Sequence, residues 1–199
     1  AVPWAEGIAM FEREQRDATY ILVDAGYIST SISVGRGEGL SALRSFSMGG
    51  GHLAADIFEV LDVPFELAER ASELVDLTYA EDAVLVADGE HVIYAAEASE
   101  IVKARLDYFA EIVKGALDGL AIPDYVPVWL TGEGIATMRG AKTFLADRLG
   151  RPVEVVAPRL PGFAKSGDSS KVSLLILAET LSKSSFGGYI KSVFNGGKK

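Results

Sequence analysis

The chain has 199 residues with 28 acidic and 19 basic side chains, a formal net charge of −9, and 49% apolar residues. This acidic balance argues against a nucleic-acid partner, because nucleic acids favour clustered lysine and arginine. The absence of cysteine excludes disulfides and thiolate metal sites, and with His52 and His91 as the only imidazoles a zinc or iron site is not expected. The apolar content suffices for one large or two small domains of a cytoplasmic protein.

Hydrophobic periodicity and turn residues predict alternating helices and strands along the chain, which indicates a layered α/β core. In chain order we expect a helix near 3–15, strands near 19–24, 29–35 and 40–47, helices near 51–61 and 65–76, strands near 83–87 and 91–95, a helix near 98–120, a strand near 126–131, a helix near 137–149, a strand near 152–156 and a helix near 171–183. The apolar stripe of the helix near 98–120 predicts core packing. The apolar run 172–181 is too short to span a membrane and is broken by Glu179, which predicts a buried helix.

The first two strands are joined by an Asp-Ala-Gly turn with hydroxyl groups beyond it. Asp24 ends the first strand, Gly26 lies in the turn, and Ser29 and Thr30 follow. A tight turn at the carboxyl end of a strand offers N–H groups to phosphate oxygens. Any β-hairpin needs such residues, however, so these residues alone favour an ordinary hairpin.

Three later segments shift the balance toward a nucleotide site. Residues 46–57 place Gly49, Gly50 and Gly51 at the start of a helix, where N–H groups and the helix dipole can receive an anion, and His52 is expected to cap this turn.

The second segment, residues 64–70, starts a helix with Pro64 and acidic residues in its first turn. Its candidate nucleotide contacts are Glu66, Glu69 and Arg70. The third segment, residues 128–140, predicts a buried strand, a Gly-x-Gly turn and a helix capped near Thr137. In this turn, too, the backbone would contact a ligand at the carboxyl end of a strand.

Taken in this order, these segments resemble the second half of the actin-like ATPase superfamily, and within it most closely the FtsA family of bacterial cell-division proteins. The resemblance is carried by residues 3–14, 23–34, 48–57, 63–70, 97–117 and 130–158. The PilM family of pilus-assembly proteins is similar in its Gly-Gly turn and remains the runner-up, but the predicted hairpin at 83–96 looks more like FtsA. Because the chain has no initiating methionine, we expect it to be a piece of a longer protein whose first half lies outside it.

This resemblance implies an actin-like, ribonuclease H-like layered core with a smaller inserted α+β subdomain. The implied core is 1–49 with 126–185 (IIA-like), the insertion is 50–125 (IIB-like), and 186–199 is a tail. Asp24 would hold magnesium through water, since that ion keeps much of its hydration shell. Gly26, Ser29, Thr30 and Gly50 would lie near the phosphates of ATP, Gly132 and Gly134 would let adenosine approach the backbone, and Glu69 would contact the ribose or base.

The family role that the resemblance implies is to bind ATP, self-associate, and tether the tubulin-like protein FtsZ at the inner face of the cell membrane at the division site. The insertion would carry the surface for the FtsZ peptide. The aromatic and basic tail at 186–199 can form an amphipathic segment for peripheral membrane contact, with a core-covering or frayed tail as the alternative. The first phosphate loop would lie in the missing half, so no ATPase activity is expected from this chain alone.

The chain also departs from the family pattern around the expected nucleotide. Tyr27 and Ile28 stand where the family hairpin has glycines, Glu133 adds a negative charge to the adenosine loop, and Ser72 replaces a frequent lysine. Bulky residues tolerate positive φ poorly and place side chains where phosphate would approach. These departures favour the alternative of a nucleotide-free interaction scaffold with the same fold.

Overall fold

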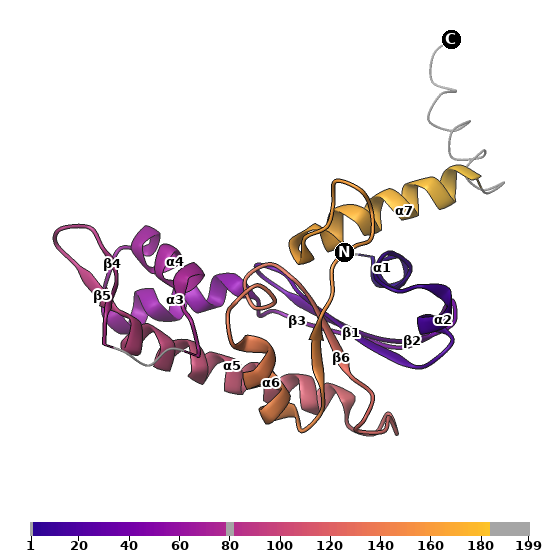
Figure 1. The fold of residues 1–199 in the computed structure, drawn as a ribbon, viewed down its shortest axis with the longest axis horizontal. Coiled ribbons are helices and arrows are strands. Elements are labelled where there is room, and N and C mark those ends of the chain that lie inside the picture. Colours follow the sequence, from indigo (N-terminus) through magenta and orange to yellow (C-terminus); the bar gives the residue numbers. More distant parts are fainter. Residues whose placement is uncertain (1, 79–81, 184–199) are drawn as a thin grey trace, which may run out of the picture.

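The computed structural model describes residues 2–78 and 82–183, which form a sheet-based core and a smaller lobe at one end of it (Figure 1). All seven predicted strands are present in this part of the chain. The predicted layered α/β class with a smaller α+β part is therefore confirmed. The boundaries proposed for the two parts stay a prediction.

The core is a five-stranded mixed sheet in the order β3-β2-β1-β6-β7. Its strands are β1 (Tyr20–Ala25), β2 (Thr30–Arg36), β3 (Gly39–Phe46), β6 (Val128–Gly132) and β7 (Val153–Val155). The central strand β1 is buried along its whole length, as expected for an apolar strand covered on both faces. It pairs with β6 in parallel, and Asp24 lies opposite Thr131 and Ala25 opposite Gly132. The carboxyl ends of these two strands therefore meet at one edge of the sheet.

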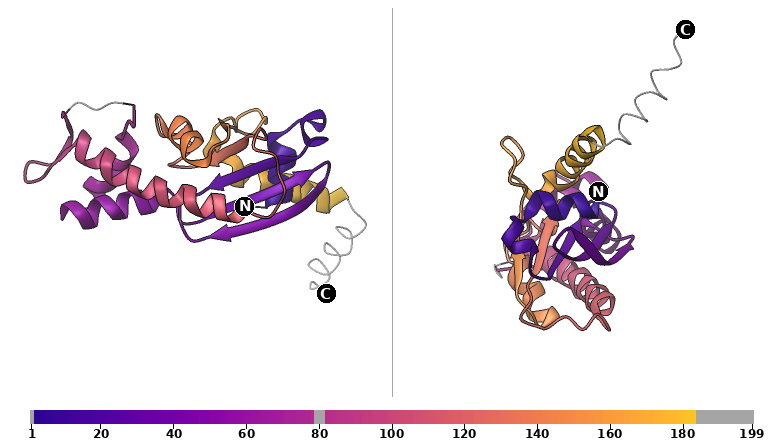
Figure 2. Two further views of the ribbon diagram at one scale, coloured as in Figure 1. Left: turned by 90° about the horizontal axis from the view of Figure 1, so that it is seen from below. Right: turned by 90° about the vertical axis from the view of Figure 1, so that its right-hand side faces the viewer.

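Helices cover both faces of the sheet (Figure 2). On one face lie α5 (Ala95–Leu117) and α6 (Ala141–Leu149), and on the other lie α1 (Pro3–Met10) and α7 (Ser169–Lys183). Side chains along a strand alternate between faces. Accordingly, Ile21 and Val23 join the large core cluster, while Tyr20 and Leu22 pack with α1. By the same alternation the side chain of Asp24 lies on the face of α1 and α7.

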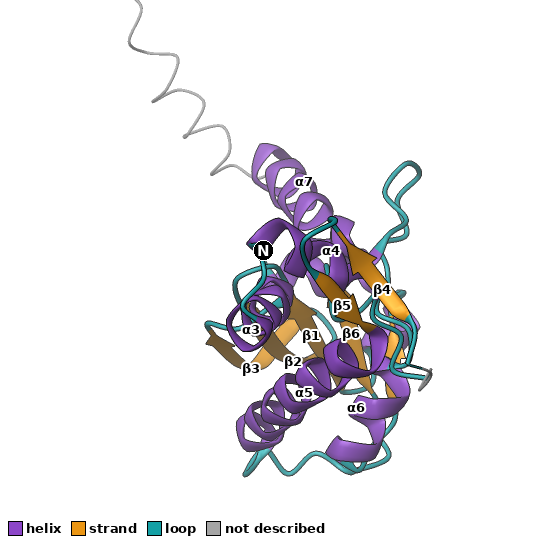
Figure 3. Ribbon diagram, turned by 90° about the vertical axis from the view of Figure 1, so that its left-hand side faces the viewer, coloured by secondary structure: helices purple, strands orange, loops and turns teal. Residues whose placement is uncertain are grey.

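The lobe follows β3 in the chain and ends in the long helix α5, which runs back along the sheet (Figure 2). Figure 3 shows the lobe from its outer end, with α3, α4 and the β4–β5 hairpin in front of the sheet. It consists of α3 (Gly50–Leu61), α4 (Phe65–Leu74), the hairpin of β4 (Val84–Ala87) and β5 (Val92–Tyr94), and the first part of α5. One continuous hydrophobic cluster joins the lobe to the sheet. Within it, Phe109 of α5 packs against Phe46 of β3 with ring centroids 5.7 Å apart. Lobe and sheet thus share a core.

The helix predicted near 3–15 is in fact two helices, α1 and the single turn α2 (Arg13–Arg16). The break is at Phe11, whose backbone is extended. The Phe11 ring packs against Tyr20 at 4.9 Å and Trp129 at 5.5 Å between ring centroids. Packing of this ring under the sheet therefore overrides the local helical pattern.

The helix predicted near 137–149 begins only at Ala141, so the predicted cap near Thr137 is wrong. Gly140, at the N-cap, has a φ of +84°, a conformation that favours glycine. The Thr137 hydroxyl instead donates to the carbonyl of Gly134, inside the preceding turn.

The prediction of a buried helix at 172–181 is also wrong. In α7, Val172 and Ser173 are buried against α1, but Leu174 is 55% and Leu175 is 50% exposed. Nothing in residues 2–78 or 82–183 covers that side of α7. The tail at 186–199 lies outside the described residues. Within the described part, no helix is both long and apolar enough to cross a membrane.

Candidate functional site

A cleft of about 630 Å³ lies between the sheet edge and the lobe. The lining residues that matter most for the chemistry of the cleft are Tyr27, Gly50, Glu69, Gly134, Lys165 and Lys171. A smaller hollow of about 250 Å³, lined by Asp24, Gly26, Gly132 and Ser169, shares Tyr27, Glu133, Gly167 and Lys171 with the cleft. The structure therefore gathers most of the residues that sequence analysis assigned to a nucleotide. The size of the cleft is in the range of small-molecule sites.

Other candidate residues lie outside this cleft. Thr30 is buried, and its hydroxyl donates to the carbonyl of Met48 at 2.7 Å. Ser29, Glu66 and Arg70 are exposed and do not line either cavity. Their proposed phosphate and nucleotide contacts stay predictions.

Glycines let three backbone segments converge at the end of the cleft next to the sheet. Gly132 and Gly134 have φ values of +102° and +84°, and a Cβ on Gly134 would lie 2.8 Å from the Cα of Gly50. The loop after β6 therefore rests directly on the start of α3. Glycine allows this close approach of the two backbone segments because it has no Cβ.

The start of α3 is bound to the β1–β2 turn by backbone hydrogen bonds. The Gly50 N–H donates to the carbonyl of Gly26 at 2.9 Å, and the Gly51 N–H donates to that of Tyr27 at 2.8 Å. The Gly49 N–H donates to Nδ1 of His52 at 3.2 Å, which confirms the predicted cap. The N–H groups expected to receive an anion are thus already paired within the protein.

We expect replacement of Gly49 by alanine to lower the free energy of unfolding by about 1–3 kcal/mol, because an added Cβ would overlap the carbonyl oxygen of Gly26 and lie 2.7 Å from that of Tyr27. Urea unfolding measures this loss. The matched control is Gly115→Ala on α5, where a Cβ meets no atom within 4 Å. Since alanine favours a helix interior, the control should gain about 0.5–1 kcal/mol. Equal effects at the two positions would contradict the close packing of the turn on α3.

Tyr27 extends from the β1–β2 turn to α4. Its hydroxyl donates to Oε1 of Glu69 at 2.6 Å, and its ring lies so close to Gly51 that a Cβ there would be 2.7 Å from the ring. The hydrogen bond to Glu69, followed by burial, raises the pKa of the Tyr27 phenol above its usual value. Tyr27 and Ile28 do not adopt positive φ, so the turn accepts these bulky residues without the backbone strain expected from the sequence.

A pair of carboxyl groups lies behind the turn, where sequence analysis identified only one. Asp24 is 5% exposed and accepts a hydrogen bond from the Ser169 hydroxyl at 3.2 Å. Glu6 of α1 is fully buried, and neither of its carboxyl oxygens faces a hydrogen-bond donor. Burial, and then the negative charge of Asp24, raise the pKa of Glu6 to about 9. Glu6 therefore holds a proton at neutral pH and can share it with Asp24.

Sequence analysis missed Glu6, although an acidic residue inside the apolar run of α1 was a visible signal. It also missed Lys165 and Lys171, which bring positive charge to the cleft from the segment before and at the start of α7. Lys171 is held by Asp168, with 3.1 Å between the Lys171 Nζ and the carboxylate. Glu69, Glu73 and Glu133 line the same cleft, so its charge is mixed.

The geometry fits the nucleoside part of ATP better than its phosphates. The positive-φ glycines and Glu69 suit an adenosine, whereas the α3 N–H groups are engaged and Tyr27 crosses the cleft. Among residues 2–78 and 82–183, no three histidine or acidic side chains are grouped as a metal site. A magnesium ion at Asp24 would therefore take its other ligands from water and phosphate, as this ion commonly does.

Known families and proteins include relatives of this chain. The family model described as cell division protein FtsA matches residues 21–173. Cell division protein FtsA of Bacillus subtilis (strain 168) is 27% identical over 169 residues, which cover 80% of this chain and 38% of that protein.

Solved structures share the fold at low sequence identity. MreB5 of Spiroplasma citri bound to ADP superposes with a TM-score of 0.70 at 14% identity. The match covers 90% of this chain and 59% of the MreB5 chain. The matched chain of the PilM–PilN type IV pilus biogenesis complex superposes with a TM-score of 0.65 at 20% identity. The match covers 89% of this chain and 51% of the matched chain. Ethanolamine utilization protein EutJ from Carboxydothermus hydrogenoformans superposes with a TM-score of 0.63 at 21% identity. The match covers 87% of this chain and 52% of EutJ. The predicted actin-like fold is confirmed, and the chain spans only part of each of these relatives.

Proposed function

The chain belongs to the FtsA family of cell division proteins, and from this premise we propose that it is part of an ATP-regulated adaptor that tethers an FtsZ-like protein to the membrane. The observation that carries the proposal is the family match over residues 21–173, which includes both the cleft and the lobe. The proposed location is the cytoplasmic face of the cell membrane at the division site. Self-association and membrane contact through residues 186–199 belong to the same proposal.

The proposed nucleotide site lies in the cleft at the carboxyl ends of β1 and β6. Asp24 would hold magnesium through water, and Gly132 and Gly134 would admit the adenosine, with Glu69 at the ribose or base. Gly26, Ser29, Thr30 and Gly50 are the proposed phosphate neighbours. Support comes from the position of Asp24 beside Gly132 and from the positive φ of both glycines. Bound ATP would supply the regulatory signal, and we expect no hydrolysis by this chain alone.

The proposed FtsZ-peptide surface is a groove of about 530 Å³ between α3 and α5. Arg105 lies in it and is held by Asp56, with 2.5 Å between Nε and Oδ2 and a second bond from Nη2. Val60 and Tyr108 present apolar surface there, at 65% and 52% exposure. Glu59 and Glu100 add negative charge to the lining. An extended or helical peptide with apolar and basic side chains would suit this groove.

Amide NMR titrations test the two sites separately. With magnesium-ATP, we expect concerted shifts at Gly26, Ser29, Glu69, Gly132 and Gly134. With the C-terminal peptide of an FtsZ protein, we expect shifts along α3 and α5 instead. If no amide shifts at millimolar nucleotide, the proposed ATP binding is contradicted. If no amide shifts with the peptide, the proposed binding of an FtsZ-like protein is contradicted.

A matched pair of variants sharpens the peptide titration. Tyr108→Ala should weaken peptide binding at least fivefold, because Tyr108 is exposed in the lining of the groove and tyrosine is among the residues that most often anchor a partner. Tyr125→Ala should bind the peptide like the unchanged chain, since Tyr125 is 80% exposed and does not line the groove.

The second candidate is a nucleotide-free interaction scaffold. One observation favours it: the α3 N–H groups are bound to the carbonyls of Gly26 and Tyr27. A PilM-like role rests on the fold alone, because the PilM chain shares only 20% identity.

A further inference from the structure

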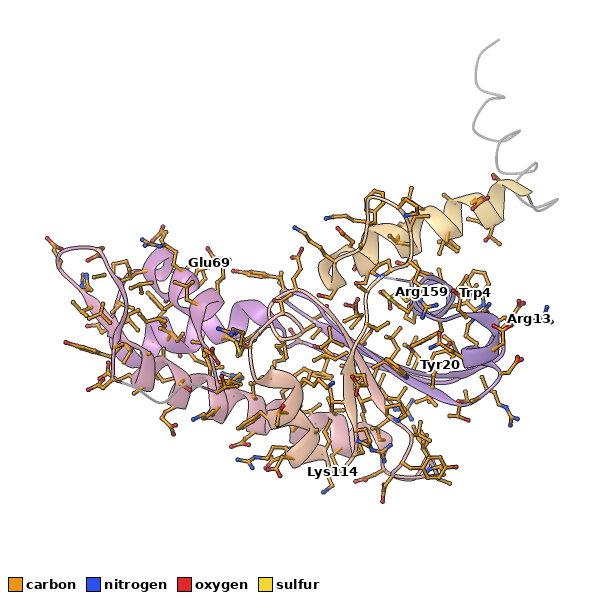
Figure 4. All side chains as sticks on the ribbon, viewed as in Figure 1. Trp4, Arg13, Tyr20, Glu69, Lys114 and Arg159 are labelled. Atoms are coloured by element: carbon orange, nitrogen blue, oxygen red, sulfur yellow. The ribbon has the colours of Figure 1, made fainter. Side chains whose placement is uncertain are left out.

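Tyr27 connects two parts of the molecule that enclose the cleft. Tyr27 belongs to the β1–β2 turn of the core, and its partner Glu69, 42 residues later, belongs to α4 of the lobe. Figure 4 shows Glu69 projecting from α4 on the side of the lobe that faces the start of α7. The hydrogen bond between them therefore crosses the cleft.

The same tyrosine also holds the turn against α3. Its carbonyl accepts the Gly51 N–H, and its ring lies on Gly51, where even a methyl group would collide. With the Gly50 N–H bound to Gly26, the first N–H groups of α3 are directed at the turn. Phosphate oxygens can reach these N–H groups only if the turn moves away from α3.

The hydrogen bond between Tyr27 and Glu69 can break at a low cost in free energy. Tyr27 is 46% exposed and Glu69 is partly exposed, so water can replace the bond when it breaks. If the pair were buried, breaking the bond would leave a desolvated carboxylate without a donor, which would cost much more free energy. Glu69 also holds the position proposed to contact the ribose or base, so ligand and Tyr27 would compete for one carboxylate.

We propose that Tyr27 is a latch on the cleft: bonded to Glu69, it keeps the β1–β2 turn on α3 and lowers nucleotide affinity, and nucleotide binds when this bond is released. The latch rests on the proposed function and names the regulation of its nucleotide site. It makes Tyr27 a residue that determines access rather than one that merely fills the place of a family glycine.

Calorimetric titration of the chain with magnesium-ATP tests the latch. Tyr27→Phe removes only the hydroxyl, and it should bind ATP about tenfold more tightly, the ratio that corresponds to about 1.4 kcal/mol for one lost hydrogen bond to a charged group. Tyr27→Gly, which also removes the ring, should bind at least as tightly as Tyr27→Phe. Tyr125→Phe is the matched control, because Tyr125 is 80% exposed and lies away from the cleft; its affinity should equal that of the unchanged chain.

A measurement without nucleotide tests the bond itself. In a pH titration followed by ring-carbon NMR, the pKa of Tyr27 should lie above the usual phenol value and should fall in Glu69→Gln, because the carboxylate that stabilises the protonated phenol is gone. An unshifted Tyr27 pKa in the unchanged chain would show that the bond does not form in solution, which overturns the latch.

The remaining outcomes separate the latch from the proposed function. Equal ATP affinity of the unchanged chain and Tyr27→Phe overturns the latch and leaves ATP binding intact. Weaker binding by Tyr27→Phe makes the hydroxyl a ligand contact, which also overturns the latch. Failure of all variants to bind ATP removes the nucleotide part of the proposed function together with the latch and favours the scaffold.

Discussion

Replacement of Phe109 by alanine is expected to lower the free energy of unfolding by about 3–5 kcal/mol. Phe109 is 1% exposed in the cluster that joins sheet and lobe, and it packs on Phe46. Its removal would leave a cavity where α5 crosses the sheet. Because the lobe and the sheet share this core, both should lose stability together.

Urea unfolding followed by circular dichroism and by the fluorescence of Trp4 and Trp129, which lie on α1 and β6 of the core, measures this loss. The control is Tyr108→Ala, the neighbouring aromatic residue on α5, which is 52% exposed and should change stability by no more than about 0.5 kcal/mol. Phe109→Ala should therefore lower stability, whereas Tyr108→Ala should weaken peptide binding and leave stability nearly unchanged. Separate transitions by the two probes in the unchanged chain would contradict a shared core.

Replacement of Glu6 by glutamine is expected to stabilise the protein at neutral and alkaline pH. The pKa of Glu6 rises from 4.5 to about 9 in the folded protein, so between these values the folded state holds a proton that the unfolded state has lost. Stability then falls with rising pH, by about 1.4 kcal/mol per pH unit. At pH 7 the accumulated cost is about 3 kcal/mol. Glutamine keeps an N–H donor near Asp24 without taking up this proton.

Unfolding free energies measured in urea from pH 5 to pH 9, in EDTA and without nucleotide, test this linkage. The gain from Glu6→Gln should be small at pH 5 and should grow steadily toward pH 9. Glu14→Gln is the control, because Glu14 is exposed on α2 and should not change the slope. Parallel pH profiles for the unchanged chain and Glu6→Gln would contradict a protonated Glu6.

Local sequence patterns were sufficient for the framework of the site. The apolar run of β1, the alternation of the later strands and the glycines at 49–51 and 132–134 predicted where the strands end and where backbone would meet a ligand. His52 was expected to cap the glycine turn, and it does. Each of these features depends on residues within a few positions of one another, so the sequence carries the information directly.

Where packing competed with local pattern, the predictions were less accurate. Phe11 ends α1 early because its ring packs between Tyr20 and Trp129. The apolar residues of α7 predicted burial, yet Leu174 and Leu175 are exposed in the described part of the chain because α7 touches α1 along only one side. Periodicity identifies an apolar face, but not what covers that face.

The sequence by itself determined the family, the α/β class and the residues at the carboxyl ends of β1 and β6. The tertiary structure alone decided the chemistry that those residues meet. It brought Ser169 to Asp24 across 145 residues of chain, placed Glu6 beside the same carboxylate, and joined Tyr27 to Glu69. Such contacts, and the raised pKa values that follow from them, depend on which helices pack on which face of the sheet, and no local spacing encodes that choice.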